Sequence, residues 1–592
     1  MQSWRSRWCV EPGALLALAA LCIYVYVAPP FIVDGDNAEF ATLSATGGVA
    51  HPPGYPLYVL YLRAMSWLPG QTAAHTAALA TALLGALTVF AIHGACRAWG
   101  ARPMSAALAT ALFAGAPIVM RLHSVAEVFA LNNLIIATIL WLSAGAGPLR
   151  GTARVIALGL VAGLGIANQH TCVLLAPVGL YGAARGLRET AHPRMAVAMG
   201  GIATLGLGLL PYAYLLAAPA SGVSWGAPHT LADVVAHFTR ADYGGLFAFS
   251  PTEGEVDVGA NLAAFATTVG RAWVWGPALV GVVALGYFSA RGSERESRWS
   301  WCLLAATWLL AGPLLSARFN VLPEGLGLAV VQRFHLFAVV LLAVPVAVGF
   351  DRMAELVQHR IAARLRLRAG TRALAVAAVF AVTSGLSLPY VAATQSPAVE
   401  RGISNMLYSM PAAAVILAVG DDIAYGTHYL QEVYGVRTDV VVVQWMQTTL
   451  DWRRRSLAAR GVAVDPYAPS TEPPSVRVAR QIFVTGRPMF MTVTPNNVLR
   501  TFGSYPYGML FRVLPPGAPM PTLDEIVAIN HDTFAAFDLN YARPHKDAAY
   551  ADVTHQRYVG TWMILARALA DAGRRADAHA ARELAENLEP LP

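Results

Sequence analysis

Charged residues are scarce in this sequence. Asp, Glu, Lys and Arg together make up 13% of the 592 residues, whereas roughly 25% is usual in soluble domains. Hydrophobic residues make up 56%, the mean hydropathy is +0.49, and lysine occurs once, at Lys546. This composition excludes an ordinary soluble globular protein and indicates that most of the chain lies in lipid.

Cysteine is also scarce, and no glycine-rich phosphate fingerprint is present. All five cysteines lie in or beside apolar runs, which excludes a disulfide framework and a zinc site: Cys9, Cys22, Cys96, Cys172 and Cys302. The formal net charge is +7, but the basic residues fall in short clusters between apolar runs, and no basic, aromatic-interleaved motif is present. We therefore expect a membrane protein that does not bind nucleic acid.

Apolar runs are abundant, and most approach the roughly 20 residues that span a bilayer. The first lacks a small-residue cleavage site, so we interpret it as an uncleaved helix and not as a signal peptide. The predicted fold class is an all-α polytopic bundle of about eleven transmembrane helices, at 14–33, 73–95, 104–120, 128–144, 155–166, 171–184, 196–217, 269–290, 299–315, 328–350 and 373–391.

Arginines collect in alternate loops, and the positive-inside rule places those loops in the cytoplasm. They include Arg5, Arg7, Arg97, Arg102, Arg150, Arg154, Arg185, Arg188, Arg194, Arg291, Arg295, Arg298, Arg360, Arg364, Arg366 and Arg368. We therefore predict a multi-pass protein of the cell inner membrane, with a cytoplasmic N-terminus and the C-terminal part on the periplasmic, outer face.

The opposite loops hold most of the polar residues of the membrane part. The first reads FIVDGDNAEFATLSATGGVAHPPGYPL over 31–57 and carries Asp34, Asp36, Glu39 and His51. Its prolines fix φ and favour extended neighbours, so we expect a stiff acidic loop that faces water at the membrane surface. The alternative is a solvated loop without function.

The other outer loops add further polar residues, in RLHSVAEVFALNN, in an NQH turn and in SWGAPHTLADVVAHFTRADYGG. Their candidates are His123, Glu127, Asn168, His170, Trp225, Arg240, Tyr243 and Arg333. An acid deep in a membrane helix costs about 2.5 to 3.5 kcal/mol, so Glu127 is expected to face a cavity. The alternative for the others is snorkelling at helix ends or, for His170, an ordinary interface histidine.

These motifs resemble the transmembrane-protein-260 family, formerly a domain of unknown function. The resemblance rests on Asp36-Asn37-Ala38-Glu39-Phe40 followed by HPPGYP, and then on AEVFALN, GLGIANQH, Trp225-Gly226, Tyr243-Gly244 and Arg333-Phe334 in order. Asn37 and Ala38 depart from the family pattern, but the two carboxylates keep their spacing. The resemblance implies a C-type membrane glycosyltransferase, similar to protein O-mannosyltransferases and inverting in outcome.

The resemblance also implies the substrates. The donor is a sugar on a polyprenyl phosphate, reached from the membrane lipid, and the acceptor is a hydroxyl of a protein or glycan. A carboxylate is needed to take the hydroxyl proton and a cation to hold the departing phosphate. We assign Asp36 as the base, Glu39 and Glu127 as its support or as acceptor ligands, and Arg333 or Arg240 as the phosphate ligand. His51, His123, Asn168, His170, Trp225 and Tyr243 are candidate substrate-binding residues.

No cofactor is expected, although Asp34-Gly35-Asp36 has the spacing of a metal-binding motif. The alternatives within enzymes are transfer to a lipid or to a glycan. The alternative outside enzymes is a transporter or flippase of lipid-linked sugars, which predicts internal repeats and paired broken helices; the sequence shows no such halves.

After residue 392 the character of the sequence changes, and the predicted domains are 1–392, 393–545 and 546–592. Segments 414–419, 423–434 and 439–443 indicate a strand, a helix and a parallel strand of a small α/β domain, with another strand at 487–493. Gly420-Asp421-Asp422 is interpreted as a turn without a catalytic role. Segments 558–570 and 575–588 predict a helical hairpin of tetratricopeptide type that caps the α/β domain or docks weakly.

Overall fold

The computed structural model describes residues 12–592 except 220, 246–256, 361–368 and 494. Most of the first two thirds of the chain is helical. The elements are α1 Pro12–Tyr26, α2 Gly35–Thr46, α3 Pro56–Ala64, α4 Ala73–Ala98, α5 Pro103–Ala114, α6 Pro117–Leu122, α7 Phe129–Ser143, α8 Gly151–Asn168, η1 His170–Leu175, α9 Ala176–Glu189, α10 Arg194–Gly208, η2 Leu210–Leu216, α11 Leu231–Phe238, η3 Ala241–Tyr243, α12 Val258–Ala272, α13 Gly276–Arg291, α14 Arg298–Leu309, η4 Leu310–Leu314, α15 Gly325–Arg360 and α16 Ala369–Thr394.

Helix α15 is the central helix of this bundle. In its most apolar stretch, 89% of the residues are buried inside the protein. The helix contacts α4, α5, α7, α12 and α13. The run from Leu336 to Ala347 is almost wholly inaccessible to solvent. A helix that is apolar on every side is buried in a protein core or in lipid, and here other helices surround it. Arg333 therefore lies on the central helix, three residues before its most deeply buried run.

Among the described residues, five helices are long and apolar enough to cross a membrane: Ala73–Ala98, Gly151–Asn168, Arg194–Leu216, Gly325–Leu356 and Gly370–Ser409. A sixth span arises if α12 and α13, which meet at an angle of 107°, are counted as one. The protein is therefore a multi-pass membrane protein, but the predicted count of eleven is not confirmed. Several predicted spans correspond to helices of 12 to 15 residues, such as α5 and α7, which is short for a bilayer.

The last third of the chain contains a mixed sheet with helices around it. Its elements are α17 Ala398–Ser409, β1 Val415–Ala418, α18 Asp421–His428, η5 Tyr429–Val433, β2 Val441–Gln444, η6 Trp445–Thr449, α19 Asp451–Ala459, α20 Pro474–Val484, β3 Met489–Met491, α21 Asn496–Thr501, β4 Ser504–Tyr507, β5 Leu510–Val513 and α22 Leu523–Ala535. The strand order is β2-β1-β3-β5-β4. Strand β1 pairs in parallel with β2 (Val415 opposite Val441) and with β3 (Val415 opposite Met489), which agrees with the predicted strand, helix and parallel strand.

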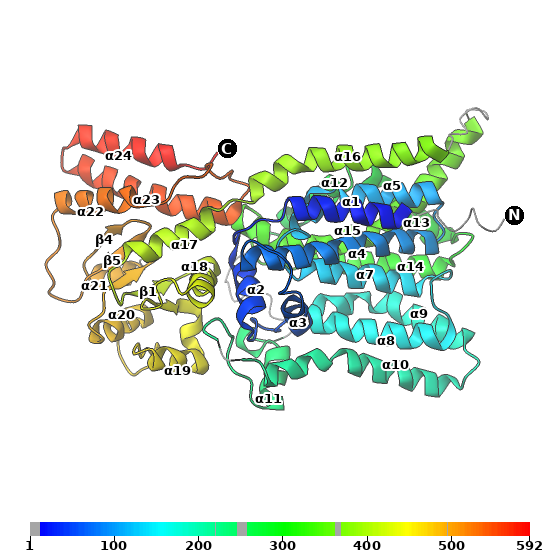
Figure 1. Cartoon of the computed structure of the whole chain (residues 1–592), viewed down its shortest axis with the longest axis horizontal. Helices are drawn as coiled ribbons and strands as arrows, with labels where there is room; N and C mark the ends of the chain where they lie inside the picture. Colours follow the sequence, from blue (N-terminus) through cyan, green and yellow to red (C-terminus); the bar gives the residue numbers. More distant parts are fainter. Residues whose placement is uncertain (1–11, 220, 246–256, 361–368, 494) are drawn as a thin grey trace.

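Two helices, α23 Ala549–Asp571 and α24 Arg575–Leu588, follow the sheet and pack against each other. Helix α23 begins nine residues before residue 558, the predicted start. It contacts the preceding elements through side chains. Arg557 pairs with Asp422 of α18 at 2.7 Å, and the Tyr558 hydroxyl bonds to Asn405 of α17 at 3.1 Å. In Figure 1 the sheet and these two helices lie at one end of the helical bundle, and α2 lies at the junction between the two parts.

Candidate active site

The acidic stretch after α1 begins a helix instead of an open loop. The side chain of Asp34 caps α2, since its Oδ1 accepts a hydrogen bond from the Asn37 amide at 2.7 Å. Asp36 and Glu39 therefore lie in the first turns of α2, where negative charge is favoured. The expectation of a loop that faces water is wrong in this respect: α18 packs on α2, Glu39 is fully buried and Asp36 is 17% exposed.

The chain reverses after α2 so that His51 returns to the helix. Gly47 and Gly48 adopt φ values of 75° and 123°, which favour glycine, and they end α2. The chain then extends to His51, passes through a cis peptide between Pro52 and Pro53, and begins α3 after Tyr55. This turn explains why the acidic motif and HPPGYP occur together in the sequence.

Arg333 joins two of the predicted acids. Its Nη1 donates to Asp36 and to Glu127, the latter at 3.0 Å. Burial opposes the ionisation of Asp36, but the charges of Arg333 and His51 outweigh it and hold the pKa of Asp36 below its usual value. Burial dominates at Glu127, which is 2% exposed, and raises its pKa to about 8. Asp36 is therefore held as a carboxylate near neutral pH, whereas burial opposes the ionisation of Glu127 despite its contact with Arg333.

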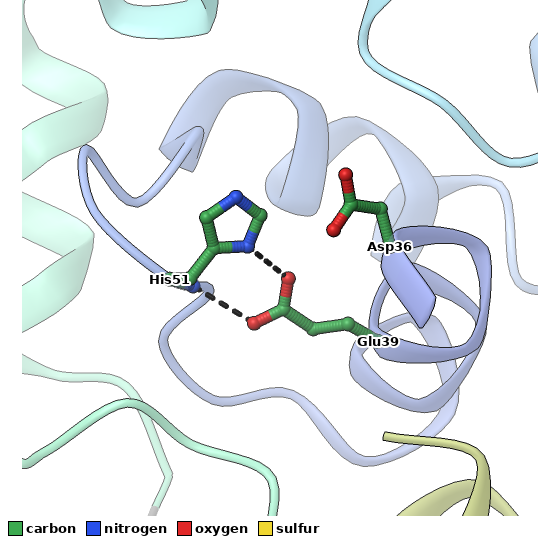
Figure 2. Close-up of side chains that lie close together, drawn as sticks. All are labelled: Asp36, Glu39 and His51. Carbon is green, nitrogen blue, oxygen red and sulfur yellow. Dashed lines mark hydrogen bonds and ion pairs between the residues drawn. The ribbon is translucent and has the colours of Figure 1, made fainter. Parts of the chain in front are cut away.

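Glu39 also has a cationic partner, His51. Its two oxygens accept hydrogen bonds from the His51 backbone amide at 2.8 Å and from the ring Nδ1 at 2.5 Å. Burial alone lowers the pKa of His51, but the Glu39 carboxylate more than compensates and raises it to about 9. Figure 2 shows this pair beside Asp36. One potential ligand atom from each of Asp36, Glu39 and His51 lies within 4.8 Å of the others, so among the described residues these three are placed to hold a metal ion.

Three other predicted residues lie at the edge of this centre. The Trp225 backbone amide donates to Val49 at 2.8 Å, and its ring packs against Tyr243, with centroids 5.5 Å apart. Arg240 stacks over Tyr243 at 5.3 Å. The buried Nε of Arg240 has no hydrogen-bond partner within the described ranges. Unlike Arg333, Arg240 is thus a cation that no carboxylate engages in the described part of the chain.

The remaining predicted residues make structural contacts. His123 is fully buried, bonds to Asn133 at 2.9 Å and packs against Tyr24. The Asn168 amide donates to the Val128 carbonyl at 3.2 Å. His170 contacts the Tyr212 hydroxyl at 3.3 Å. These contacts position helices around Glu127, and a role in substrate binding stays a prediction.

The structure brings two further residues to the centre that the sequence analysis did not select. Asp421, the first residue of α18, lies close enough to Asp36 for the two charges to interact, and so does Tyr550 of α23. The sequence held one signal for Asp421, because it follows a buried strand directly and ligands of α/β sheets bind at the carboxyl ends of strands. Tyr550 lies in a helix that looked peripheral, and no local signal identifies it.

The structure is similar to the crystal structure of ArnT from Cupriavidus metallidurans bound to undecaprenyl phosphate. The TM-score is 0.51 at 13% identity, over 86% of this chain and 99% of that chain. The fold is therefore that of the C-type membrane glycosyltransferases. Within that class, residues 36–185 match the model of the protein O-mannosyl-transferase TMEM260 N-terminal domain.

Two relatives lead to the same family. The chain is 28% identical over 479 residues to the protein O-mannosyl-transferase TMEM260 of Mus musculus, and 26% identical over 264 residues to that of Dictyostelium discoideum. These alignments cover 76% and 41% of this chain, and 64% and 32% of the relatives. The chain thus spans less than two thirds of either relative. Its resemblance to the transmembrane-protein-260 family, predicted from its motifs, is confirmed.

Proposed function

We propose that this protein transfers mannose or a similar hexose from a polyprenyl-phosphate donor to a hydroxyl group, on a protein, at the outer face of the cell inner membrane. The observation that carries the proposal is the centre formed by Asp36, Arg333 and Glu127. It places an ionised carboxylate and a fixed cation together where the bundle meets the α/β part. The names of the two relatives support protein O-mannosylation.

The residues of this centre suit glycosyl transfer. Asp36 takes the proton of the acceptor hydroxyl as the hydroxyl oxygen bonds to the anomeric carbon. The bond from that carbon to the phosphate oxygen breaks, and the lipid phosphate leaves with the electron pair. Positioned proton transfer contributes roughly 10²- to 10⁴-fold to rate. Arg333 keeps Asp36 ionised and fixes its orientation, and Glu127 holds Arg333 from the other side.

Arg240 is the better of the two predicted phosphate ligands. Both arginines have a buried Nε without a hydrogen-bond partner among the described residues, but Arg333 is paired with Asp36 and Glu127, whereas Arg240 forms no ion pair with any described residue. Arginine donates several hydrogen bonds in a planar fork that matches phosphate oxygens. We assign Arg240 to the phosphate of the donor and Arg333 to the orientation of the base.

A pocket of about 430 Å³ in the bundle fits the lipid of the donor. Apolar residues of α5, α6, α12 and α16 form most of its wall, including Leu112, Ile118 and Leu386. Gln332, next to Arg333 on α15, and Arg271 of α12 also line it. An apolar cavity with cations near it accommodates an isoprenoid chain attached to a phosphate.

We propose that the reaction needs no metal ion. Each acid of the possible metal site already has a cationic partner, since Arg333 engages Asp36 and His51 engages Glu39. A divalent cation would have to displace both. Stabilisation of the phosphate by arginine supplies the positive charge that the reaction requires.

The test is transfer from a radiolabelled polyprenyl-phosphate sugar in detergent. Asp36→Asn preserves shape but cannot take a proton, so transfer is expected to fall by at least about 10²-fold. Because Arg333 keeps Glu127 as a partner, the melting temperature is expected to change little. Asp257→Asn, an exposed helix cap outside the centre, is the matched control and should transfer normally. Normal transfer by well-folded Asp36→Asn would contradict the assignment.

The same assay distinguishes the alternatives. The wild-type rate is expected to persist with a chelator, whereas loss on chelation and recovery with Mn²⁺ or Mg²⁺ would establish a metal site. Label recovered on a lipid or glycan, and not on protein, would correct the acceptor. Label that crosses the membrane on its carrier without transfer would identify a transporter.

A further inference from the structure

Asp421 lies where the α/β part meets the bundle. Strand β1 ends at Ala418, Gly420 turns the chain with a φ of 113°, and Asp421 begins α18. Gln444, the last residue of the parallel neighbour β2, donates its side-chain amide to Asp421 Oδ1 at 2.7 Å. The carboxyl group thus stands at the carboxyl ends of two parallel strands, which is where α/β sheets bind their ligands.

The bundle approaches Asp421 very closely. Gly35 of α2, between Asp34 and Asp36, packs against it so tightly that a Cβ on Gly35 would lie 2.9 Å from the Cβ of Asp421. Only a residue without a side chain permits this approach. The Asp36 carboxylate lies near enough to interact with that of Asp421, so the two acids share one site.

Asp421 differs from the other acids of the centre in its partners. Asp36, Glu39 and Glu127 are each bonded to a cation, and the adjacent Asp422 is paired with Arg557. Asp421 forms no ion pair with any described residue, and its one hydrogen-bond donor within the described ranges is a neutral amide. It is also exposed to solvent, whereas Asp422 is buried. Asp421 is therefore an acid of the centre that is open to a hydrogen-bond donor from outside.

We propose that Asp421 positions the acceptor: its carboxylate accepts a hydrogen bond from an N–H or O–H group of a peptide that presents its hydroxyl to Asp36. This assignment rests on the proposed function and specifies its acceptor side. The acceptor then enters between the sheet and the bundle, while the donor lies in the apolar pocket of the bundle. Asp421 is a positioning residue, because the proton of the reacting hydroxyl passes to Asp36.

The experiment measures peptide binding directly, so that it does not depend on transfer. A fluorescein-labelled peptide with a single threonine among alanine and glycine residues is titrated with the purified full chain, and anisotropy gives Kd. Asp421→Asn and Asp421→Ala are expected to raise Kd by roughly 10- to 100-fold, the range for loss of one hydrogen bond to a charged group. Asp421→Glu should restore part of the affinity. Asp524→Asn, an exposed first-turn aspartate of α22, is the matched control and should bind like wild type.

A second arm uses the transfer assay with the same peptide. Asp421→Asn is expected to raise KM for the peptide while KM for the donor and the slow hydrolysis of the donor by water stay at wild-type values. Unchanged Kd and KM in a variant that melts like wild type would overturn the role of Asp421, as would an equal fall in donor hydrolysis. A wild-type protein that binds the peptide but transfers no sugar would overturn the proposed function and leave the binding result to decide the role of Asp421.

Discussion

At the scale of single residues, two acids that share one arginine have pKa values shifted in opposite directions. Asp36 has a lowered pKa because Arg333 and His51 both face it, whereas burial raises the pKa of Glu127 to about 8. The sequence selected both acids from their place in the outer loops. It did not assign their states, because these depend on how much water and how many cations the fold leaves beside each carboxylate.

His51 gives a test of these charges by pH. Its pKa rises from 6.5 in the unfolded chain to about 9 in the folded protein. The protonated ring therefore stabilises the fold fully below about pH 6.5 and loses this contribution as pH rises through 9, by roughly 3 kcal/mol in total. His51→Gln keeps a hydrogen-bond donor near Glu39 but removes the charge.

The measurement is the melting temperature of both proteins in detergent from about pH 6 to pH 9.5. Wild type is expected to melt well above His51→Gln at the acid end, and the gap should close toward the alkaline end. A gap of constant size across this range would show that the ring is neutral in the folded protein and that its bond to Glu39 carries no charge.

At the scale of elements, α2 shows what local sequence conveys and what it omits. Asp34 is a good helix cap and precedes two acids, which is a recognisable start signal. The acidic residues and the following prolines nevertheless favoured a loop that faces water, because nothing in the local sequence shows that another element covers this segment. Helix α18, from about 390 residues further along the chain, covers α2 instead. Strands β4 and β5 were missed because SYPY and LFRV are not continuous apolar runs, unlike the equally short β1 and β2.

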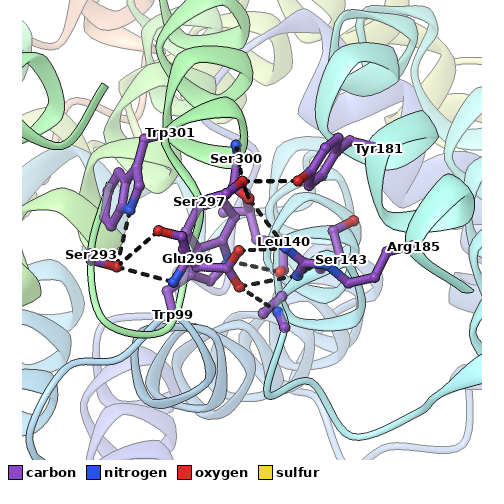
Figure 3. A network of polar contacts seen from close by, with 12 residues as sticks. Trp99, Leu140, Ser143, Tyr181, Arg185, Ser293, Glu296, Ser297, Ser300 and Trp301 are labelled. Atoms are coloured by element: carbon purple, nitrogen blue, oxygen red, sulfur yellow. Dashed lines mark hydrogen bonds and ion pairs between the residues drawn. The ribbon is translucent and has the colours of Figure 1, made fainter. Parts of the chain in front are cut away.

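A buried ion pair joins three elements at the end of the bundle away from α2. Glu296, between α13 and α14, accepts hydrogen bonds from Arg185 of α9 at 2.6 Å and 3.1 Å and from the Gly145 amide after α7. Glu296 is 2% exposed. Figure 3 shows this network together with Ser300 and Trp301 of α14. It fixes the loop ends of four helices relative to one another.

Glu296→Gln is expected to lower the free energy of unfolding by about 3 to 5 kcal/mol, because it leaves the Arg185 charge without a carboxylate. The control is Glu355→Gln, which removes a partially exposed partner of Arg102 and Arg352 and should cost less than about 1 kcal/mol. Thermal and denaturant unfolding in the same detergent compare the two. Equal effects of both changes would show that the Glu296 pair contributes no more than a surface pair.

At the scale of the whole molecule, the centre draws on distant parts of the chain. Asp36, Glu127, Arg333, Asp421 and Tyr550 belong to separate elements and interact at one junction. In the sequence, the assignment of alternate loops to opposite faces of the membrane placed Asp36, Glu127 and Arg333 on the same face. It carried no information about the last two, because the docking of the α/β part onto the bundle depends on tertiary packing such as that of Gly35 on Asp421.

Topology is the prediction at this scale. In a cysteine-free variant, a single cysteine at exposed Ser470, near the sheet, is expected to react with an impermeant thiol reagent in intact spheroplasts. A cysteine at exposed Glu294, in the arginine-rich loop between α13 and α14, should react only after lysis. The expectation follows from the positive-inside rule. If only Glu294→Cys is labelled in intact spheroplasts, the orientation is the opposite of the one predicted.

The contacts of α23 have a consequence for the order of synthesis. The ribosome completes α2 and α15 long before it reaches α23. Yet Tyr550 of α23 lies near Asp36, and Arg557 of α23 pairs with Asp422. A nascent chain already inserted in the membrane therefore holds Asp36 and Arg333 without their cover from α18 and α23. The centre is complete only when the hairpin folds back onto α18, so we expect the proposed sugar transfer to begin after translation of α23 and not during insertion of the bundle.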